Sequence, residues 1–173
     1  MNLWHDVATG KNPPEDVNVI VEIQKGSQNK YEYNKEIGIF ELNRVLYSSV
    51  HYPVDYGFIP QTLGEDKDPL DAIVLVTNPT LPGVLIPSRP IGVLKMVDSG
   101  EGDDKILCVP IKDPRFSHIK DIKDVGQATL DEISNFFKTY KQLENKKVDI
   151  VGWDNKKSAE QVILNSMKRF KKS

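Results

Sequence analysis

Hydrophobic and polar positions alternate in several short segments, which predicts a protein built mainly from β-strands. In residues 17–23 (VNVIVEI), the three valines and Ile23 fall on one face of the expected strand and Glu22 on the other. Residues 31–33 (YEY) and 39–45 (IFELNRV) flank the turn sequence NKEIG, a spacing typical of a hairpin. We therefore expect antiparallel strand pairing from the N-terminal part of the chain onward.

Four later segments also have strand character. Residues 70–77 (LDAIVLVT) form a nearly continuous run of apolar, mostly β-branched side chains, which predicts a central strand. Residues 91–97 (IGVLKMV) and 105–111 (KILCVPI) flank an acidic turn and predict another hairpin, and residues 148–153 (VDIVGW) predict one further strand. With Pro and Gly as turn punctuation between them, these strands favour a barrel-like or strongly bent antiparallel sheet.

Helical periodicity appears only after residue 126. Thr129 followed by Glu132, and Ser158 followed by Gln161, each have the spacing of a helix-capping box. Apolar side chains follow each box at helical spacing: Leu130, Ile133, Phe136, Phe137, Tyr140 and Leu143 after the first, and Val162, Ile163 and Phe170 after the second. Strands followed by two flanking helices indicate the α+β class.

Length and composition are those of one ordinary globular domain, which we expect to span residues 1–173. The longest apolar runs, such as AIVLV at 72–76, are too short to cross a membrane. The first sixteen residues lack a basic start followed by an apolar core, so we expect no secretory signal. The single cysteine, Cys108, cannot form an internal disulfide and favours a reducing compartment, most simply the cytoplasm.

Negative charge is concentrated in two segments. The net charge is only −2, which argues against a protein that coats nucleic acid. Residues 55–71, however, contain five acids and one base, and residues 98–104 contain four acids and no base. Two acidic segments separated by apolar strands are a first indication of a metal site.

Three aspartates, Asp66, Asp68 and Asp71, fall within six residues directly before the predicted central strand. Two unit charges about 4 Å apart repel by about 4 kcal/mol at an effective dielectric of about 20, so such a cluster must be solvated, protonated or bound to a cation. Oxygen ligands without nearby Cys or His suit Mg²⁺, Mn²⁺ or Ca²⁺. A solvated acidic turn remains an alternative, whereas Pro69 and the following strand exclude an EF-hand loop.

A second pair of carboxylates favours the metal interpretation. Asp98 ends one strand of the later hairpin and Asp103 precedes its partner strand, so both acidic segments converge if this hairpin lies beside the strand after Asp71. More carboxylates than one ion requires suggest two or more ions, as in in-line phosphoryl displacement. No Gly-rich loop for nucleotide phosphates is present, so ATP-type substrates are not indicated.

The order of several motifs carries a specific resemblance. They are VIVEI, KYEY, NRVLY, YPVDYGFIPQT, EDKDPLDAIVL, RPIGVLKMVD, GDDKILCVP, HIKDI and FFKTYKQLE. With these motifs the chain resembles the soluble family I inorganic pyrophosphatases of prokaryotic type, from about Glu15 to the C-terminal helix. The resemblance implies a bent five-stranded OB-like barrel, assembly into homohexamers, and hydrolysis of inorganic diphosphate to two orthophosphates by direct attack of a metal-activated water. It also implies Mg²⁺ as the usual metal, with Mn²⁺ or Zn²⁺ as substitutes.

The same resemblance implies roles for individual residues. The metal ligands would be Asp66, Asp71 and Asp103 for the tighter ions, Asp98 for a third, and Glu32 for an ion that arrives with substrate. The phosphate oxygens would be held by Lys30, Arg44, Tyr56, Lys105, Tyr140 and Lys141. Asp68 would orient or deprotonate the attacking water, with Glu22 and Tyr52 supporting it. Two positions depart from the family pattern: Lys67 replaces the usual Gly and Ser99 an acid.

Two other functions remain as alternatives. An OB-type barrel with lysines and aromatic side chains could bind single-stranded nucleic acid, although the acidic segments would repel its phosphates. A Ca²⁺-stabilised structural domain would explain the carboxylates but would leave Lys30, Arg44 and Lys141 without a purpose. An enzyme that acts on diphosphate accounts for both sets of charges.

Overall fold

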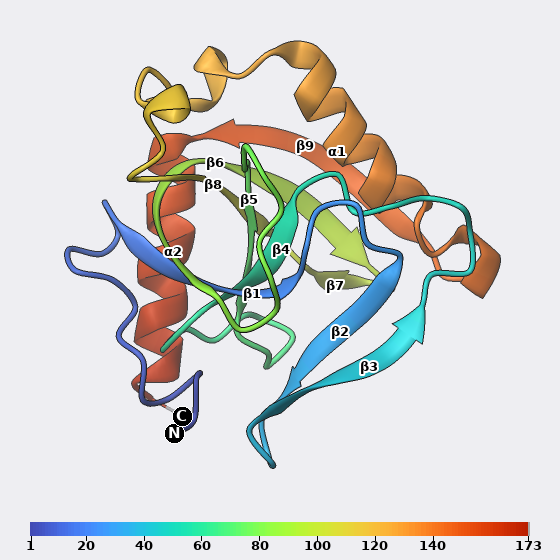
Figure 1. Cartoon of the computed structure of the whole chain (residues 1–173), viewed down its shortest axis with the longest axis horizontal. Coiled ribbons are helices and arrows are strands. Elements are labelled where there is room, and N and C mark those ends of the chain that lie inside the picture. The colour runs from blue at the N-terminus through green and yellow to red at the C-terminus, as the bar shows by residue number, and fades with distance from the viewer. Residues whose placement is uncertain (173) are drawn as a thin grey trace.

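The computed structural model describes residues 1–172 and has the predicted α+β architecture (Figure 1). Its strands are β1 (Val17–Ile23), β2 (Asn29–Asn34), β3 (Ile39–Val45), β4 (Asp55–Ile59), β5 (Leu70–Val74), β6 (Leu85–Asp98), β7 (Glu101–Gly102), β8 (Lys105–Pro110) and β9 (Val148–Asn155). Its helices are α1 (Gln127–Thr139) and α2 (Lys156–Phe170), with short 3₁₀ turns η1 (Pro114–Phe116), η2 (Ile122–Asp124) and η3 (Gln142–Glu144).

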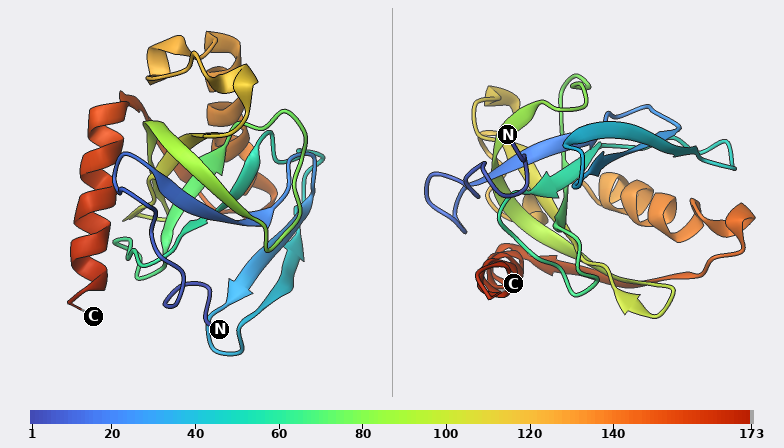
Figure 2. Two further views of the ribbon diagram at one scale, coloured as in Figure 1. Left: turned by 60° about the vertical axis from the view of Figure 1, so that its left-hand side comes forward. Right: turned by 90° about the horizontal axis from the view of Figure 1, so that it is seen from below.

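Five strands form a closed ring in the order β1, β4, β5, β8 and β6, and β6 returns to pair with β1. The pairings are antiparallel except that β5 and β8 are parallel, so the expectation of a wholly antiparallel sheet is wrong at this one pair. β6 is long enough to pair with β7 and β9 as well. The hairpin of β2 and β3 forms a separate sheet that projects from the ring (Figures 1 and 2).

β1 departs from the simple two-faced strand expected from its sequence. All of its residues except Asn18 are buried, because both faces of β1 are covered. Val17, Val19 and Val21 belong to one core cluster, whereas Ile23 belongs to another. The change of face follows from a register shift in the pairing with β4 between Val21 and Ile23. This shift lies next to Glu22, a predicted site residue.

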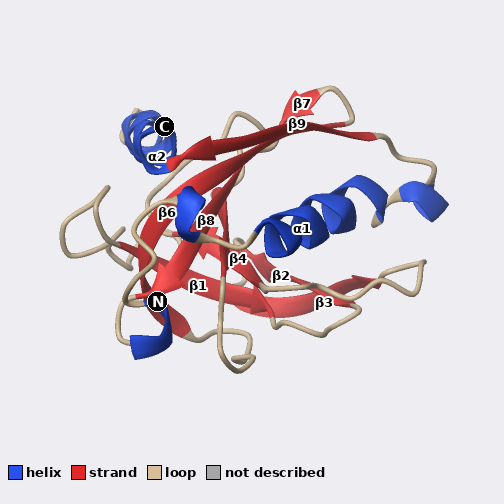
Figure 3. Ribbon diagram, turned by 90° about the horizontal axis from the view of Figure 1, so that it is seen from above, coloured by secondary structure: helices blue, strands red, loops and turns tan. Residues whose placement is uncertain are grey.

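The two helices cover different parts of the ring. α1 runs along β9, and α2 follows at the end of that strand (Figure 3). The indole N–H of Trp153 in β9 donates to Ser134 Oγ of α1 at 2.8 Å and so ties helix to strand. Ala159 and Ile163 of α2 are fully buried in the cluster that contains the valines of β1. α2 is therefore anchored on the ring by apolar packing.

Both predicted capping boxes are wrong. α1 begins two residues before Thr129 and has Gly126 at its N-cap, without a side-chain cap. α2 begins at Lys156, and the side chain of Asn155 caps it by accepting from the Ser158 N–H at 3.0 Å. In both cases a residue close by in sequence starts the helix earlier than the Ser/Thr-x-x-Glu/Gln pattern indicates.

The predicted apolar face of the first helix is correct through Tyr140, which is buried with Leu130, Ile133, Phe136 and Phe137. Leu143 is the exception, because α1 has already ended and η3 leaves this side chain exposed. Cys108 is buried in β8, as expected for a core thiol. Within residues 1–172, no helix has the length and apolar character needed to cross a membrane.

Candidate active site

A pocket of about 310 Å³ brings the two acidic segments together at one side of the ring. Twelve predicted site residues line it: Glu22, Lys30, Glu32, Tyr56, Asp66, Asp68, Asp71, Asp98, Asp103, Lys105, Tyr140 and Lys141. They come from the ring, from the β2–β3 hairpin, from the loop before β5 and from the end of α1. The expected convergence of the segments around Asp71 and Asp98 is thus confirmed.

A charged triad forms around Lys105, whose side chain is almost fully buried. Its Nζ lies 2.5 Å from Asp71 Oδ2 of β5 and 2.5 Å from Asp103 Oδ1, which precedes β8. Burial alone would lower the pKa of Lys105, but the two carboxylates outweigh burial and raise it, so the side chain stays charged. Burial, together with the nearby Asp71, raises the pKa of Asp103. One ammonium therefore partly neutralises two carboxylates that would otherwise repel each other.

Three further lysine–carboxylate pairs surround this triad. Lys30 contacts Glu32 along β2, and Lys141 contacts Asp98 at the end of β6. Although burial opposes it, the contact with Lys141 holds the pKa of Asp98 below its usual value. The third pair joins Lys35 in the β2–β3 turn to Asp68. Each lysine predicted to bind phosphate thus contacts a carboxylate predicted to bind metal.

Glu22 lies buried beneath these charged groups. Its Oε1 accepts a hydrogen bond from the Tyr33 N–H at 2.8 Å. Loss of hydration on burial raises the pKa of Glu22 to about 8, despite that hydrogen bond. Tyr56 and Tyr140 also have pKa values raised well above 10 by burial, so their hydroxyls remain protonated donors at neutral pH.

The loop of residues 64–69, here called the aspartate loop, carries Asp66 and Asp68 in an irregular conformation. Gly64 N–H donates to Asp68 O at 2.7 Å, and Asp66 Oδ1 accepts from Asp68 N–H at 3.0 Å. Burial and the charges of Asp103 and Asp68 raise the pKa of Asp66. Lys67 has φ of 68°, a conformation that favours glycine, and its side chain is exposed.

Two predicted site residues lie away from the pocket lining. Arg44 on β3 is oriented toward η3, where its Nε lies 3.0 Å from Glu144 Oε1. Tyr52 is fully buried, with its ring centroid 4.7 Å from that of Phe136 and 5.6 Å from that of Tyr56. Tyr52 therefore packs behind Tyr56, and Arg44 would have to leave Glu144 in order to reach a phosphate in the pocket.

Sequence reasoning missed two charged residues that contact this site. Lys35 lines the pocket and also lies over the Trp4 ring, 5.1 Å from its centroid. Glu144 forms the ion pair with Arg44. Lys35 lies in a turn sequence, and its contact spans 33 residues, so no local pattern could identify it. Glu144 stood within the motif FFKTYKQLE but had no assigned role.

The chemistry of the pocket fits a divalent cation that prefers oxygen ligands. Its lining contains seven carboxylates and no Cys or His. Among residues 1–172, no three such groups already converge as a metal-binding cluster. Instead, ammonium groups lie against Asp71, Asp98 and Asp103, where positive charge is needed. The donor set is therefore suitable for metal, with lysines neutralising the carboxylates in this structure.

Comparison with known proteins decides the family. The model of the inorganic pyrophosphatase family matches residues 19–171. The chain belongs to the inorganic pyrophosphatase family. It is 50% identical over 174 residues to an inorganic pyrophosphatase of Haloferax volcanii, covering 100% of this chain and 98% of the relative. It is 49% identical over 164 residues to soluble inorganic pyrophosphatase 3 of Arabidopsis thaliana, covering 95% and 76%.

A crystal structure of inorganic pyrophosphatase from Thermus thermophilus has the same fold as this chain. The TM-score is 0.96 at 44% identity, and the alignment covers 99% of each chain. Both the resemblance found in the sequence and the predicted hydrolysis of diphosphate to orthophosphate are thereby confirmed. The alternatives of a nucleic-acid-binding module and a Ca²⁺-stabilised structural domain are not supported.

Proposed function

We propose that this pocket binds Mg²⁺ and inorganic diphosphate together. Asp66, Asp71 and Asp103 would hold the tighter ions, Asp98 a third, and Glu32 an ion that accompanies substrate. The observation that carries this proposal is the position of Lys105 Nζ, 2.5 Å from each of two carboxylates. A site whose carboxylates already require one buried cation is suited to others.

Bound Mg²⁺ would neutralise phosphate oxygens and lower the pKa of a coordinated water. The protein's own contribution begins with the lysine–carboxylate pairs. The carboxylates that contact Lys30, Lys105 and Lys141 would be neutralised by bound Mg²⁺ instead. The three ammonium groups, still charged and near the pocket, could then bind phosphate oxygens. Tyr56 and Tyr140 would add hydroxyl donors, and Arg44 would join them on leaving Glu144.

Asp68 is the residue we assign to the attacking water. It lies at the exposed edge of the pocket, outside the ring strands, where it can accept a proton and exchange it with solvent. The diphosphate phosphorus gains the water oxygen and loses the bridging oxygen, which departs with the second orthophosphate. Glu22 and Tyr52 would support this reaction from buried positions.

Phosphate release from diphosphate tests the metal requirement directly. We expect release with millimolar Mg²⁺ and none above background with excess EDTA. Thermal melts of the same samples supply a readout independent of turnover, because an ion that binds only the folded state raises Tm. Turnover in EDTA, or an unchanged Tm with Mg²⁺, would contradict the proposed metal site without affecting the family assignment.

We further propose that the chain forms homohexamers and acts in the cytoplasm. Exposed apolar side chains on and beside β3 support an assembly, since Ile37, Ile39, Leu42, Val45 and Tyr47 all face solvent in the single chain. The reduced, buried Cys108 is compatible with a reducing compartment. Light scattering coupled to gel filtration should give six times the 19.6 kDa of one chain.

A further inference from the structure

The aspartate loop is shaped locally but positioned from elsewhere. Internal hydrogen bonds close it on itself, as the contact between Gly64 N–H and Asp68 O shows. These bonds do not fix where the loop sits relative to Asp98 and Asp103, which belong to a different hairpin. The loop's C-terminal end continues directly into β5, which fixes that end on the ring. The position of the entering end depends on residues 61–63, here called the stem.

Helix α2 holds the stem through both backbone polar groups of Leu63. Arg169 Nε donates to Leu63 O at 2.8 Å, and Leu63 N–H donates to Ser166 O at 3.0 Å. Arg169 also donates to Ser166 Oγ at 2.9 Å, which orients the guanidinium. Arg169 is 106 residues from Leu63 along the chain. A charged donor on a backbone carbonyl makes a stronger hydrogen bond than a neutral donor.

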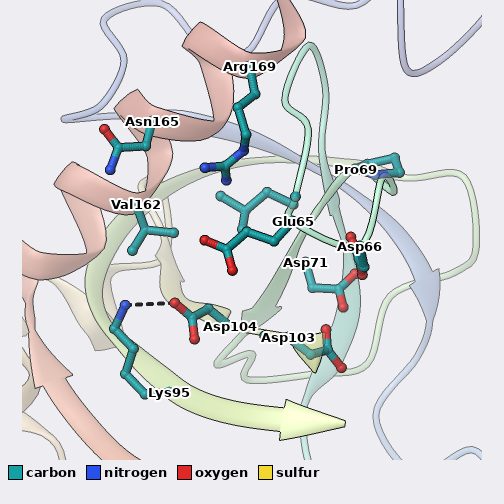
Figure 4. A pocket seen from close by; sticks show the side chains of 13 residues that line it. Glu65, Asp66, Pro69, Asp71, Lys95, Asp103, Asp104, Val162, Asn165 and Arg169 are labelled. Atoms are coloured by element: carbon teal, nitrogen blue, oxygen red, sulfur yellow. Dashed lines mark hydrogen bonds and ion pairs between the residues drawn. The ribbon is translucent and has the colours of Figure 1, made fainter. Parts of the chain in front are cut away.

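Packing does not hold the loop on the side that faces α2. A cavity of about 160 Å³ lies there, lined by the aspartate loop, by Asp103 and Asp104, and by Asn165 and Arg169 of α2. Figure 4 shows Arg169 extending from α2 toward the loop, with Asp66, Asp71 and Asp103 across the cavity. On this side, therefore, the hydrogen bonds from α2 to the stem restrain the entering end of the loop.

α2 is a suitable reference for this restraint. Ala159 and Ile163 are fully buried against the ring, so the helix that bears Arg169 moves with β1, β5 and β8. On the other side, Trp4 Nε1 donates to Thr62 O at 2.8 Å and Gln61 N–H donates to Trp4 O at 2.8 Å. The stem is therefore held between the N-terminal segment and α2.

We propose that Arg169 is a positioning residue for metal binding, because it sets the distance of Asp66 from Asp71 and Asp103. This inference rests on the proposed function of these aspartates as metal ligands. Arg169 itself would touch neither metal nor substrate. Its loss would leave the loop folded but free to shift, so each binding event would have to restore the ligand geometry.

The test compares Arg169→Met with Lys168→Met, which removes a neighbouring exposed charge of α2. Calorimetry should show that Arg169→Met binds Mg²⁺ about tenfold more weakly. This is the effect of losing one charge-assisted hydrogen bond when the whole loss is expressed as lower metal affinity. The Mg²⁺ concentration for half-maximal phosphate release should rise in parallel, and saturating Mg²⁺ should restore most of kcat. Lys168→Met should bind Mg²⁺ as the unchanged protein does.

Arg169→Lys keeps one charged donor and should give an intermediate Mg²⁺ affinity. This variant also allows the test to be made if Arg169→Met does not fold. A lower Tm with unchanged Mg²⁺ binding in the Arg169 variants would mean a purely structural role and would overturn the inference. If calorimetry detected no Mg²⁺ binding to the protein without substitutions, the proposed metal site would be wrong, and the inference with it.

Discussion

The base of the pocket and its edge handle charge in different ways. At the base, Lys105, Asp71 and Asp103 have side chains that are 2%, 19% and 15% exposed, and two of the three are in ring strands. At the edge, Lys35 and Asp68 are 36% and 61% exposed and lie in a turn and a loop. Coulomb energies grow as water is excluded, so the charges at the base depend on one another more strongly than Lys35 and Asp68 do at the edge.

This contrast suggests a division of labour. Strands hold the groups whose separation must stay constant while several charges are bound, because a ring of paired strands resists distortion. The edge carries Asp68, which we propose accepts the proton of the attacking water and exchanges it with solvent. Substitutions in the two regions should therefore differ in kind as well as in size.

The largest difference should separate Asp68→Asn from Asp71→Asn. Asp68→Asn retains the shape but removes the proton acceptor, so kcat should fall about 10²- to 10⁴-fold with little change in Mg²⁺ dependence. Asp71→Asn should weaken metal binding first, and added Mg²⁺ should recover part of the activity. Mg²⁺ titrations of phosphate release and Tm distinguish them. If high Mg²⁺ restored the activity of Asp68→Asn, the assignment of Asp68 as the base would be wrong.

Stability should distinguish the two regions in metal-free protein. Lys105→Met leaves Asp71 and Asp103 without their buried cation and should lower the free energy of unfolding by about 3–5 kcal/mol. Lys35→Met removes an exposed pair and should cost about 1 kcal/mol or less. Urea denaturation in EDTA measures both. Equal losses in the two variants would mean that burial does not distinguish base from edge.

The pH dependence of stability should reveal Glu22 beneath the base. Its pKa is about 8 in the folded protein and 4.5 ordinarily, so the folded state binds the extra proton between these values. The contribution of Glu22 to the free energy of unfolding should therefore be most favourable below about pH 4.5 and should fall as pH rises toward 8. Glu22→Gln should flatten this fall. Urea denaturation in EDTA across this range checks the slope, with Glu65→Gln, an exposed acid, as control.

The smallest effect should come from Lys67→Gly in the aspartate loop. Lys67 adopts a positive φ of 68° with an exposed side chain, so glycine relieves backbone strain there. Greater freedom of glycine in the unfolded chain offsets part of this gain, which leaves a change of about 1 kcal/mol or less. Activity should be kept, with Mg²⁺ activation slightly tighter. Loss of most activity would mean that Lys67 contacts substrate.

The sequence alone was sufficient for most of the strands, for the helical region and for twelve of the residues that line the pocket. Alternating and continuous apolar segments predicted β2, β3, β5 and β9, because side-chain periodicity depends only on local backbone geometry. The ordered motifs located the carboxylates around Asp66 and Asp98. Such features can be predicted from sequence because they depend on neighbouring residues or on a fixed order of motifs.

Other features depended on contacts between distant segments, and only the tertiary structure decided them. The parallel pairing of β5 with β8 and the register shift beside Glu22 both follow from how distant strands pair around the ring. The contacts of Lys35 with Asp68 and of Arg169 with Leu63 join residues 33 and 106 positions apart. The β2–β3 hairpin and helix α2 lie outside the ring and create these proximities by packing against it. No periodicity along the chain records which polar groups will meet once these elements have packed.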